Sequence, residues 1–367
     1  MEHISELVII LNHFFKWNKS RMYCFANMVI GLIKTRSVNL VEIACAFAGD
    51  AKQESKYKRI IRFFRKFTFD YATVARWMIY QFGLDAQPFY IAMDRTDWKF
   101  GKKKINILML SVVYKGIGIP IMWNLLNKKG TSSTKERIAI ITRFIDTFGK
   151  KNIAGILADR EFIGGAWISW LLKNNIPFCI RIKKASKITN QRGKQVNAWQ
   201  PFCHLRYGEH LILPMQYNLW GVPVFLSGTR SIKGELVIVV MNRCLQEALQ
   251  VYSYRWQTET LFAALKSRGF NFEETHLTHI DRLEKLIAVL AIAFCWAHKT
   301  GEWRHSIQPI PLKKHGRRLY SYFRYGLDLI QSCLFNNLNH LNIFDFFTTP
   351  LALSYQPYHF SYLEVFS

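Results

Sequence analysis

Four side chains between Tyr252 and Lys266 have the types and the spacing of a site that handles phosphate. Tyr252, Arg255, Glu259 and Lys266 follow one another at steps of three, four and seven residues. In a single α-helix over 252–266, turning by about 100° per residue, they fall within a stripe about 60° wide. A carboxylate that shares a face with an Arg, a Lys and a Tyr suits a charged phosphate and a metal ion. The alternative is an exposed face on which Arg255 and Glu259 form an i,i+4 ion pair.

Two further carboxylates follow apolar runs that are typical of β-strands. Phe89 to Met93 ends in Asp94, and Ile153 to Ala158 ends in Asp159. Open α/β sheets place their ligands at the carboxyl ends of strands, so we expect both aspartates and Glu259 to converge at one sheet edge. Each aspartate taken alone is also typical of a turn. The acidic residues that compete for these roles are Asp97, Asp146 and Glu161.

Clustered carboxylates favour a hard divalent ion. Like charges raise one another's pKa unless a cation offsets them. Oxygen-only ligands suit Mg²⁺ or Mn²⁺ rather than zinc. Two such ions about 4 Å apart activate the attacking oxygen and stabilise the leaving oxygen of a phosphoryl transfer, which predicts phosphodiester cleavage and joining. The chain has no HExxH, GxSxG, Walker or GxGxxG motif. The sequence therefore lacks the motifs on which zinc proteases, serine hydrolases, nucleotide hydrolases and dinucleotide-binding enzymes depend.

Length and charge set the broad class. A chain of 367 residues is expected to form two to four units. Lys and Arg total 50 against 25 Asp and Glu, a formal charge of +25. Such a balance indicates a polyanion partner, of which nucleic acid is the commonest; a membrane-surface protein is the alternative.

Membrane and redox signals point to a cytoplasmic protein. The longest apolar run, Leu286 to Ala297, has twelve residues. It is too short to span a bilayer and predicts a buried helix that packs against the sheet. The N-terminus shows no secretory signal. Seven cysteines without a CxxC pair favour reduced thiols over disulfides or a zinc site.

The N-terminal residues 1–86 have helical periodicity and form a candidate DNA-binding domain. Between Lys56 and Phe67, cations alternate with aromatic and branched residues. One face can therefore pack while the other reaches phosphates. A solvated basic face is the alternative. The candidate DNA-binding residues are Lys58, Arg59, Arg62, Arg65 and Lys66.

From Gln87 the pattern predicts an α/β fold in the order β-β-β-α-β-α-β. Ser133 and Glu136 form a capping box for the first of its helices, and Gly149 ends that helix. The order implies a mixed sheet with helices on both faces. The expected strands are 89–93, 105–114, 119–125, 153–158 and 177–182, and the expected helices are 133–149 and 166–174.

The chain is accordingly divided into five segments. A β-rich insertion, 184–244, interrupts a catalytic domain made of 87–183 and 245–300. A C-terminal helical region, 301–367, carries a basic aromatic segment at 313–325 and ends in an aromatic tail past Pro350 whose role the sequence does not indicate.

The signature Tyr252-(2)-Arg255-(3)-Glu259-(6)-Lys266 resembles the YREK motif of bacterial insertion-sequence transposases of the DDE type, the IS-four family. The segments around Asp94 and Asp159 resemble the other two parts of that family's DDE set, in the same order. The resemblance covers roughly residues 89–270 strongly and the two ends more loosely.

The resemblance implies a ribonuclease H-like catalytic domain with a β-rich insertion, acting as a cut-and-paste transposase on terminal inverted repeats. It implies that Asp94, Asp159 and Glu259 hold two Mg²⁺ (or Mn²⁺) ions, while Tyr252, Arg255 and Lys266 contact phosphates at the cleaved end. It also implies hairpin formation, strand transfer, a homodimer in the synaptic complex, double-stranded DNA as partner, no membrane, and a cytoplasmic protein that joins the nucleoid when bound to DNA.

Members of that family also stack an extruded base on an aromatic group. Trp256 is one candidate here; Trp220, in a turn-like context, is a weaker one for which a core position is the alternative. Two other functions stay open: a transposase-derived DNA-binding repressor that does not cut, and a ribonuclease H-like nuclease that cuts without joining.

Overall fold

The computed structural model describes residues 2–101 and 103–336, and these form two compact units. The first unit takes the described residues within 1–86, 97–106 and 262–355, and the second takes 87–96 and 107–261. The aromatic tail past Pro350 lies outside the described residues. No helix in the described part of the chain is long and apolar enough to cross a membrane.

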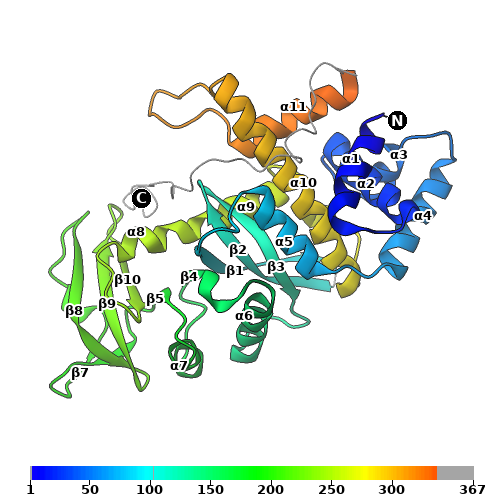
Figure 1. Cartoon of the computed structure of the whole chain (residues 1–367). Coiled ribbons are helices and arrows are strands. Elements are labelled where there is room, and N and C mark those ends of the chain that lie inside the picture. Colours follow the sequence, from blue (N-terminus) through cyan, green and yellow to red (C-terminus); the bar gives the residue numbers. More distant parts are fainter. Residues whose placement is uncertain (1, 102, 337–367) are drawn as a thin grey trace. The chain divides into compact units, whose positions relative to one another are not determined.

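The strands form one ten-stranded mixed sheet (Figure 1). Its spatial order is β3-β2-β1-β4-β5-β10-β9-β8-β6-β7. The strands are β1 (Phe89–Phe100), β2 (Lys103–Tyr114), β3 (Ile117–Leu125), β4 (Ile153–Ala158), β5 (Phe178–Ile182), β6 (Lys187–Thr189), β7 (Gln195–Asn197), β8 (His210–Leu219), β9 (Val222–Arg230) and β10 (Leu236–Met241).

The first five strands have the arrangement of a ribonuclease H-like domain, which confirms the predicted fold class. β2 pairs antiparallel with β3, whereas β4 pairs in parallel with both β1 and β5. The parallel strands are connected through α6 (Thr134–Phe148) and α7 (Gly165–Lys173). The capping box of Ser133 and Glu136 starts α6 as predicted, and Gly149, at a φ of +84°, ends it.

The β-rich insertion continues this sheet. β10, with the apolar sequence Leu-Val-Ile-Val-Val-Met, pairs antiparallel with β5, and β9 and β8 follow it outward. A strand apolar at every position is typically covered on both faces, and Val237, Val239 and Met241 of β10 belong to one buried cluster with Ala248, Leu249 and Val251. The insertion strands therefore lengthen the catalytic sheet at its β5 edge.

Helices cover both faces of the sheet, as the predicted order implied. Phe89 contacts Phe144 of α6, with ring centres 5.9 Å apart. Tyr90, the next residue of β1, packs with Tyr254, with ring centres 6.1 Å apart. Successive strand residues point to opposite faces, so α6 and the Tyr254 segment lie on opposite sides of β1. Ala92, and then Asp94, share the face of Tyr90.

The segment that carries the four-residue signature is not one helix. It consists of α8 (Ala248–Ser253), a 3₁₀ turn η3 (Tyr254–Trp256) and α9 (Gln257–Leu265), so the prediction of a single helix over 252–266 is wrong. Two buried hydrogen bonds fix the start of α9: Tyr114 N donates to Gln257 Oε1 at 2.9 Å, and the hydroxyls of Ser111 and Thr258 lie 2.7 Å apart. Tyr252, in α8, and Arg255, in η3, are three residues apart and therefore lie near each other on neighbouring turns.

The first unit is helical around an aromatic core. Trp17 packs against Phe25, Phe67 and Phe69, with ring centres 4.7–5.3 Å apart. The helices and the short 3₁₀ turn are α1 (Glu2–Phe15), α2 (Lys19–Thr35), α3 (Leu40–Cys45), α4 (Gln53–Lys66), α5 (Tyr71–Gln81), η4 (Phe272–Glu274), α10 (Ile280–Ile307) and α11 (Tyr322–Asn336).

The apolar run Leu286 to Ala297 lies within α10 and is buried, as predicted. Its principal neighbours are other helices, α2, α4, α5 and α11, so the prediction that it packs against the sheet is not confirmed. Gly301 of α10 meets α11 so closely that a Cβ there would lie 1.8 Å from the carbonyl oxygen of Tyr322. All seven cysteines are free thiols.

Candidate active site

Asp94 and Asp159 occupy adjacent positions on neighbouring strands. β1 runs on to Phe100, so the prediction that Asp94 ends a strand is wrong. The pairing of β1 with β4 nevertheless stops at Met93 opposite Ala158, and the next residue on each strand is an aspartate. Asp159 directly follows β4, as predicted. The parallel register therefore sets the backbones of the two aspartates about one strand spacing apart, roughly 4.8 Å.

Arg255 connects Asp94 to Glu259. Its Nη1 lies 3.0 Å from Asp94 Oδ2, and its Nη2 lies 2.8 Å from Glu259 Oε1. Asp94 Oδ1 accepts a further bond from the backbone N–H of Arg95 at 2.8 Å. The i,i+4 pair of Arg255 and Glu259 does form, but the Arg255 side chain is only 9% exposed. The stripe is therefore not a solvated face.

Tyr252 connects the same cluster to the second aspartate. Its hydroxyl donates to Asp159 Oδ1 at 3.3 Å, and that oxygen also accepts from the backbone N–H of Arg160 at 2.7 Å. The Arg255 guanidinium carbon lies 5.9 Å from the centre of the Tyr252 ring. The structure thus links five of the predicted groups, Asp94, Asp159, Tyr252, Arg255 and Glu259, in the second unit.

Burial governs the protonation of this cluster. It raises the pKa of Asp94 to about 6; the positive charge of Arg255 opposes the rise, and the carboxylates of Glu259 and Glu161 add to it. Burial likewise raises the pKa of the Tyr252 hydroxyl. For Arg255, burial alone would lower the pKa, but Tyr252, Asp94 and Glu259 hold it above its ordinary value. Arg255 therefore stays charged.

The donor types fit a hard divalent cation, because carboxylate oxygens are its usual ligands. In the described part of the chain, however, no three His, Cys, Asp or Glu side chains lie close enough together to hold a metal ion. The guanidinium of Arg255 takes the place of a cation between Asp94 and Glu259. Binding of an ion by both carboxylates would require them to exchange these hydrogen bonds.

Lys266 belongs to the first unit, where it contacts Glu273 and Trp98. Its Nζ lies 2.8 Å from Glu273 Oε1 and 5.2 Å from the centre of the Trp98 ring. Trp256 is 47% exposed, with its ring centre 5.8 Å from the Arg255 guanidinium carbon. Trp220 is 39% exposed, so the core position considered for it is wrong.

Of the three competing acidic residues, Glu161 lies near enough to Asp94 to help raise its pKa, but its own carboxylate is paired. Glu161 is bound by Arg95, with Nε 3.0 Å from Oε1. Asp97 pairs with Lys104 at 2.6 Å within the first unit. Asp146 is exposed on α6.

Arg137 is a supporting residue that the sequence analysis missed. From α6 it donates to the carbonyl oxygens of Ile163 at 3.1 Å and Glu161 at 3.0 Å, and it also bonds Ser132. It thereby fixes the loop that follows Asp159. A signal was present: Arg137 precedes Ile140, Ile141 and Phe144 by three, four and seven residues, which places it on the buried face of the helix.

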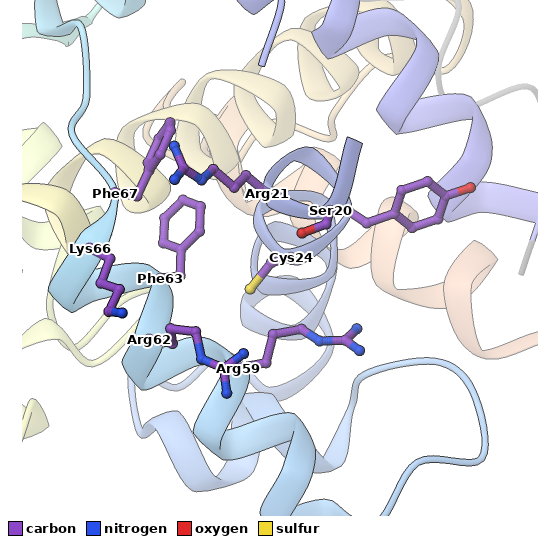
Figure 2. Close-up of a pocket in the computed structure, with 9 residues that line it drawn as sticks. Ser20, Arg21, Cys24, Arg59, Arg62, Phe63, Lys66 and Phe67 are labelled. Carbon is purple, nitrogen blue, oxygen red and sulfur yellow. The ribbon is translucent and has the colours of Figure 1, made fainter. Parts of the chain in front are cut away.

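The predicted DNA-binding cations are all exposed on α4, and three of them, Arg59, Arg62 and Lys66, line a pocket of about 420 Å³. Figure 2 shows these three on one helix, with Arg21 and Cys24 on another that faces it. Arg21, from α2, adds a cation that was not predicted. Lys58, by contrast, pairs with Glu54 at 2.6 Å.

Comparison with known proteins identifies the family. Residues 82–296 match the family described as the transposase DDE domain. No match was found among curated proteins. Among solved structures, the chain is similar to the piggyBac transposase in a synaptic complex with hairpin DNA, with a TM-score of 0.44, 12% identity, and coverage of 96% of this chain and 84% of that one. Since the matched segment spans more than half of the chain and contains Asp94, Asp159 and Glu259, this protein belongs to the DDE transposase domain family.

Proposed function

We propose that this protein is a cut-and-paste DNA transposase of the IS-four type. The observation that carries the proposal is the continuous contact path Asp159–Tyr252–Arg255–Asp94, with Glu259 on the second arm of Arg255. It joins the three carboxylates with Tyr252 and Arg255 of the YREK-like signature in one partly buried cluster within the segment that matches the family.

Asp94, Asp159 and Glu259 are the residues that would hold divalent ions, two Mg²⁺ or Mn²⁺ in our proposal. Bound there, such ions supply activation of the attacking oxygen and stabilisation of the leaving oxygen. The protein's own side chains would bind the phosphate and position the DNA. Arg255 and Tyr252 offer donors to the phosphate, Lys266 adds a cation, and the exposed ring of Trp256 offers a surface on which an extruded base can stack.

The proposed reaction proceeds by phosphoryl transfer. Water attacks a phosphorus at the transposon end and displaces a 3′ hydroxyl. That hydroxyl attacks the opposite strand and closes a hairpin, which water reopens. The freed 3′ hydroxyl then attacks target DNA. The helical region 1–86 would bind the terminal inverted repeats through α4, and two copies would bring the two ends together as a homodimer.

The test is cleavage of duplexes taken from the DNA that flanks the gene, with Mg²⁺ or Mn²⁺ and with a chelator. Metal-dependent nicking and hairpin formation should fall by roughly 10²- to 10³-fold or more in Asp94→Ala, Asp159→Ala and Glu259→Ala. Asp146→Asn, an exposed carboxyl on α6, should retain activity. Retained activity in any of the three alanine variants removes that residue from the catalytic set.

A gel shift beside the cleavage assay separates the other functions. Binding without metal-dependent cutting would favour a repressor. Cutting without joining to a target would favour a nuclease.

A further inference from the structure

A second basic pocket lies in the second unit, lined by residues to which no role has been assigned. It measures about 450 Å³ and lies where the end of β5 meets the turn between β9 and β10. Its charged lining consists of five cations and one carboxylate: Arg160, Arg181, Lys183, Lys184, Arg230 and Glu235.

Glu235 is held between two guanidinium groups. Arg181 Nη2 bonds Glu235 Oε1, and Arg160 Nη1 lies 4.0 Å from the same oxygen. The Arg181 side chain is 14% exposed, whereas that of Glu235 is 57% exposed. The exposed Glu235 carboxylate therefore binds the largely buried guanidinium of Arg181 from the side that faces solvent. Paired guanidinium groups of this kind bind phosphate as well as carboxylate.

The backbone around Glu235 is fixed independently of its side chain. Glu235 N donates to Ser231 Oγ at 3.1 Å, and Ser231 N donates to Glu235 O at 2.9 Å. Arg230 Nε donates to the carbonyl oxygen of Leu205 at 2.8 Å. The Glu235 carboxylate can therefore move aside while the turn keeps its shape.

The other cations of the pocket leave its charge unbalanced. Lys183 and Lys184 are exposed, and within residues 2–101 and 103–336 neither forms an ion pair. Five cations against one carboxylate give this concave surface a strongly positive potential, which attracts anions. Glu235 offsets only part of it.

The sheet register places Arg181, which lines the pocket, next to the proposed active site. The last paired residues of β4 and β5 are Ala158 and Ile180, so Arg181 stands beside Asp159 as Asp159 stands beside Asp94. Neighbouring strands are about 4.8 Å apart. A nucleic acid strand with one phosphate at the carboxylates can therefore present another phosphate to the long side chain of Arg181.

We propose that this pocket binds a backbone phosphate of the DNA strand that leaves the active site, and that the Glu235 carboxylate occupies the phosphate position in the free protein. The inference rests on the proposed function, since it takes DNA as the substrate. Glu235 must give up its bonds to Arg181 and Arg160 when the strand binds. The Glu235 carboxylate therefore weakens DNA binding. Neutralising this carboxylate should strengthen DNA binding.

The experiment measures binding of a fluorescent oligo(dT) strand to the full chain by anisotropy, in chelator, between about 50 and 200 mM salt. Glu235→Gln should bind roughly three- to tenfold more tightly, with a steeper salt slope by about 0.7 for one added phosphate contact. Lys184→Ala should bind more weakly. Asp146→Asn makes the same charge change on α6 and is the matched control.

A second measurement localises the effect. In wild type, oligo(dT) should protect Lys183 and Lys184 from acetylation more than it protects the exposed Lys173 of α7, and Glu235→Gln should increase that protection. An affinity gain no larger than that of Asp146→Asn, or equal protection of all three lysines, would overturn the proposal. Neither measurement needs cleavage, so a protein that does not transpose can still pass, and an active transposase can still fail.

Discussion

Arg255 lies between two of the three carboxylates proposed for catalysis, with Nη1 3.0 Å from Asp94 Oδ2 and Nη2 2.8 Å from Glu259 Oε1. Carboxylates brought together without a cation resist ionising together. The guanidinium offsets that repulsion in the metal-free protein and holds Asp94 and Glu259 at opposite arms of one rigid fork. The residue proposed to contact phosphate is thus also the one that keeps two of the proposed catalytic carboxylates together.

Removal of Arg255 should destabilise the second unit. Asp94 is buried, and a buried charge that loses its partner costs about 3–5 kcal/mol. We therefore expect Arg255→Ala to lower the urea concentration at the midpoint of unfolding, measured in the presence of a chelator. Arg255→Lys, which keeps the positive charge but not the two-armed guanidinium, should lose less stability. Arg192→Ala, at an exposed arginine in the same unit, should change stability by no more than about 0.5 kcal/mol. An Arg255→Ala protein as stable as Arg192→Ala would show that the bridge contributes nothing.

The raised pKa of Asp94 predicts a pH-dependent loss of stability in the metal-free protein. Its pKa is about 6 when folded, against an ordinary value of 3.8, so between these values the folded state binds more protons there than the unfolded state. This contribution is fully present below about pH 4 and is lost as the pH rises through 6. The free energy of unfolding of wild type, minus that of Asp94→Asn, should therefore fall by about 1–3 kcal/mol from pH 4 to 7. A difference that stays constant with pH would contradict the raised pKa.

Much of this site was predictable because its parts have local signals. Apolar runs that stop at Asp94 and Asp159 mark strands, and the spacing from Tyr252 to Glu259 marks a common face. The interruption of the signature helix by η3 had no local signal, and the residues directly after η3 are held by hydrogen bonds to Ser111 and Tyr114 of the distant strand β2. Strand pairing also joins residues that are far apart in the chain, so the features that it creates have no local signal either.

The neighbours of a strand depend on pairing that periodicity does not encode. β1 extends past Asp94 although the sequence there turns polar. β10 returns to β5 and so brings Glu235 to Arg181, 54 residues earlier in the chain. Register, once known, explains the row Asp94, Asp159 and Arg181, but the sequence alone does not supply it.

Arg137 should be required for the order of the loop after Asp159. Its guanidinium donates to two loop carbonyls and to Ser132, and these acceptors become unpaired if it is shortened. Each buried acceptor left unpaired costs about 1–3 kcal/mol. We expect Arg137→Met to lower the free energy of unfolding by about 2–4 kcal/mol and to speed amide exchange at 160–163. Lys135→Ala, exposed on the same helix, serves as control. Unchanged amide exchange at 160–163 would show that Arg137 does not order that loop.

On α4, the pocket-lining cation should matter more for DNA than the paired one. Arg62 lines the basic pocket with Arg21, whereas the charge of Lys58 is offset by Glu54. Arg62→Ala should weaken binding of duplex DNA and reduce the salt slope by about 1, as expected for one lost phosphate contact. Lys58→Ala on the same helix should have a smaller effect on both. Equal effects of the two substitutions would show that α4 acts only through its total charge.

Lys266 is proposed to contact the phosphate of the cleaved end, and its pair with Glu273 offers a way to test that role. A charge-assisted hydrogen bond contributes about 1.5–3 kcal/mol, so Lys266→Ala should slow end cleavage by roughly 10- to 100-fold. Glu273→Gln breaks the same 2.8 Å ion pair but leaves the ammonium. If Lys266 acts on phosphate, Glu273→Gln retains most of the cleavage while both variants lose similar stability. If the lysine serves only the fold of its own unit, the two variants will match in cleavage as well as in stability, and Lys266 then leaves the proposed site.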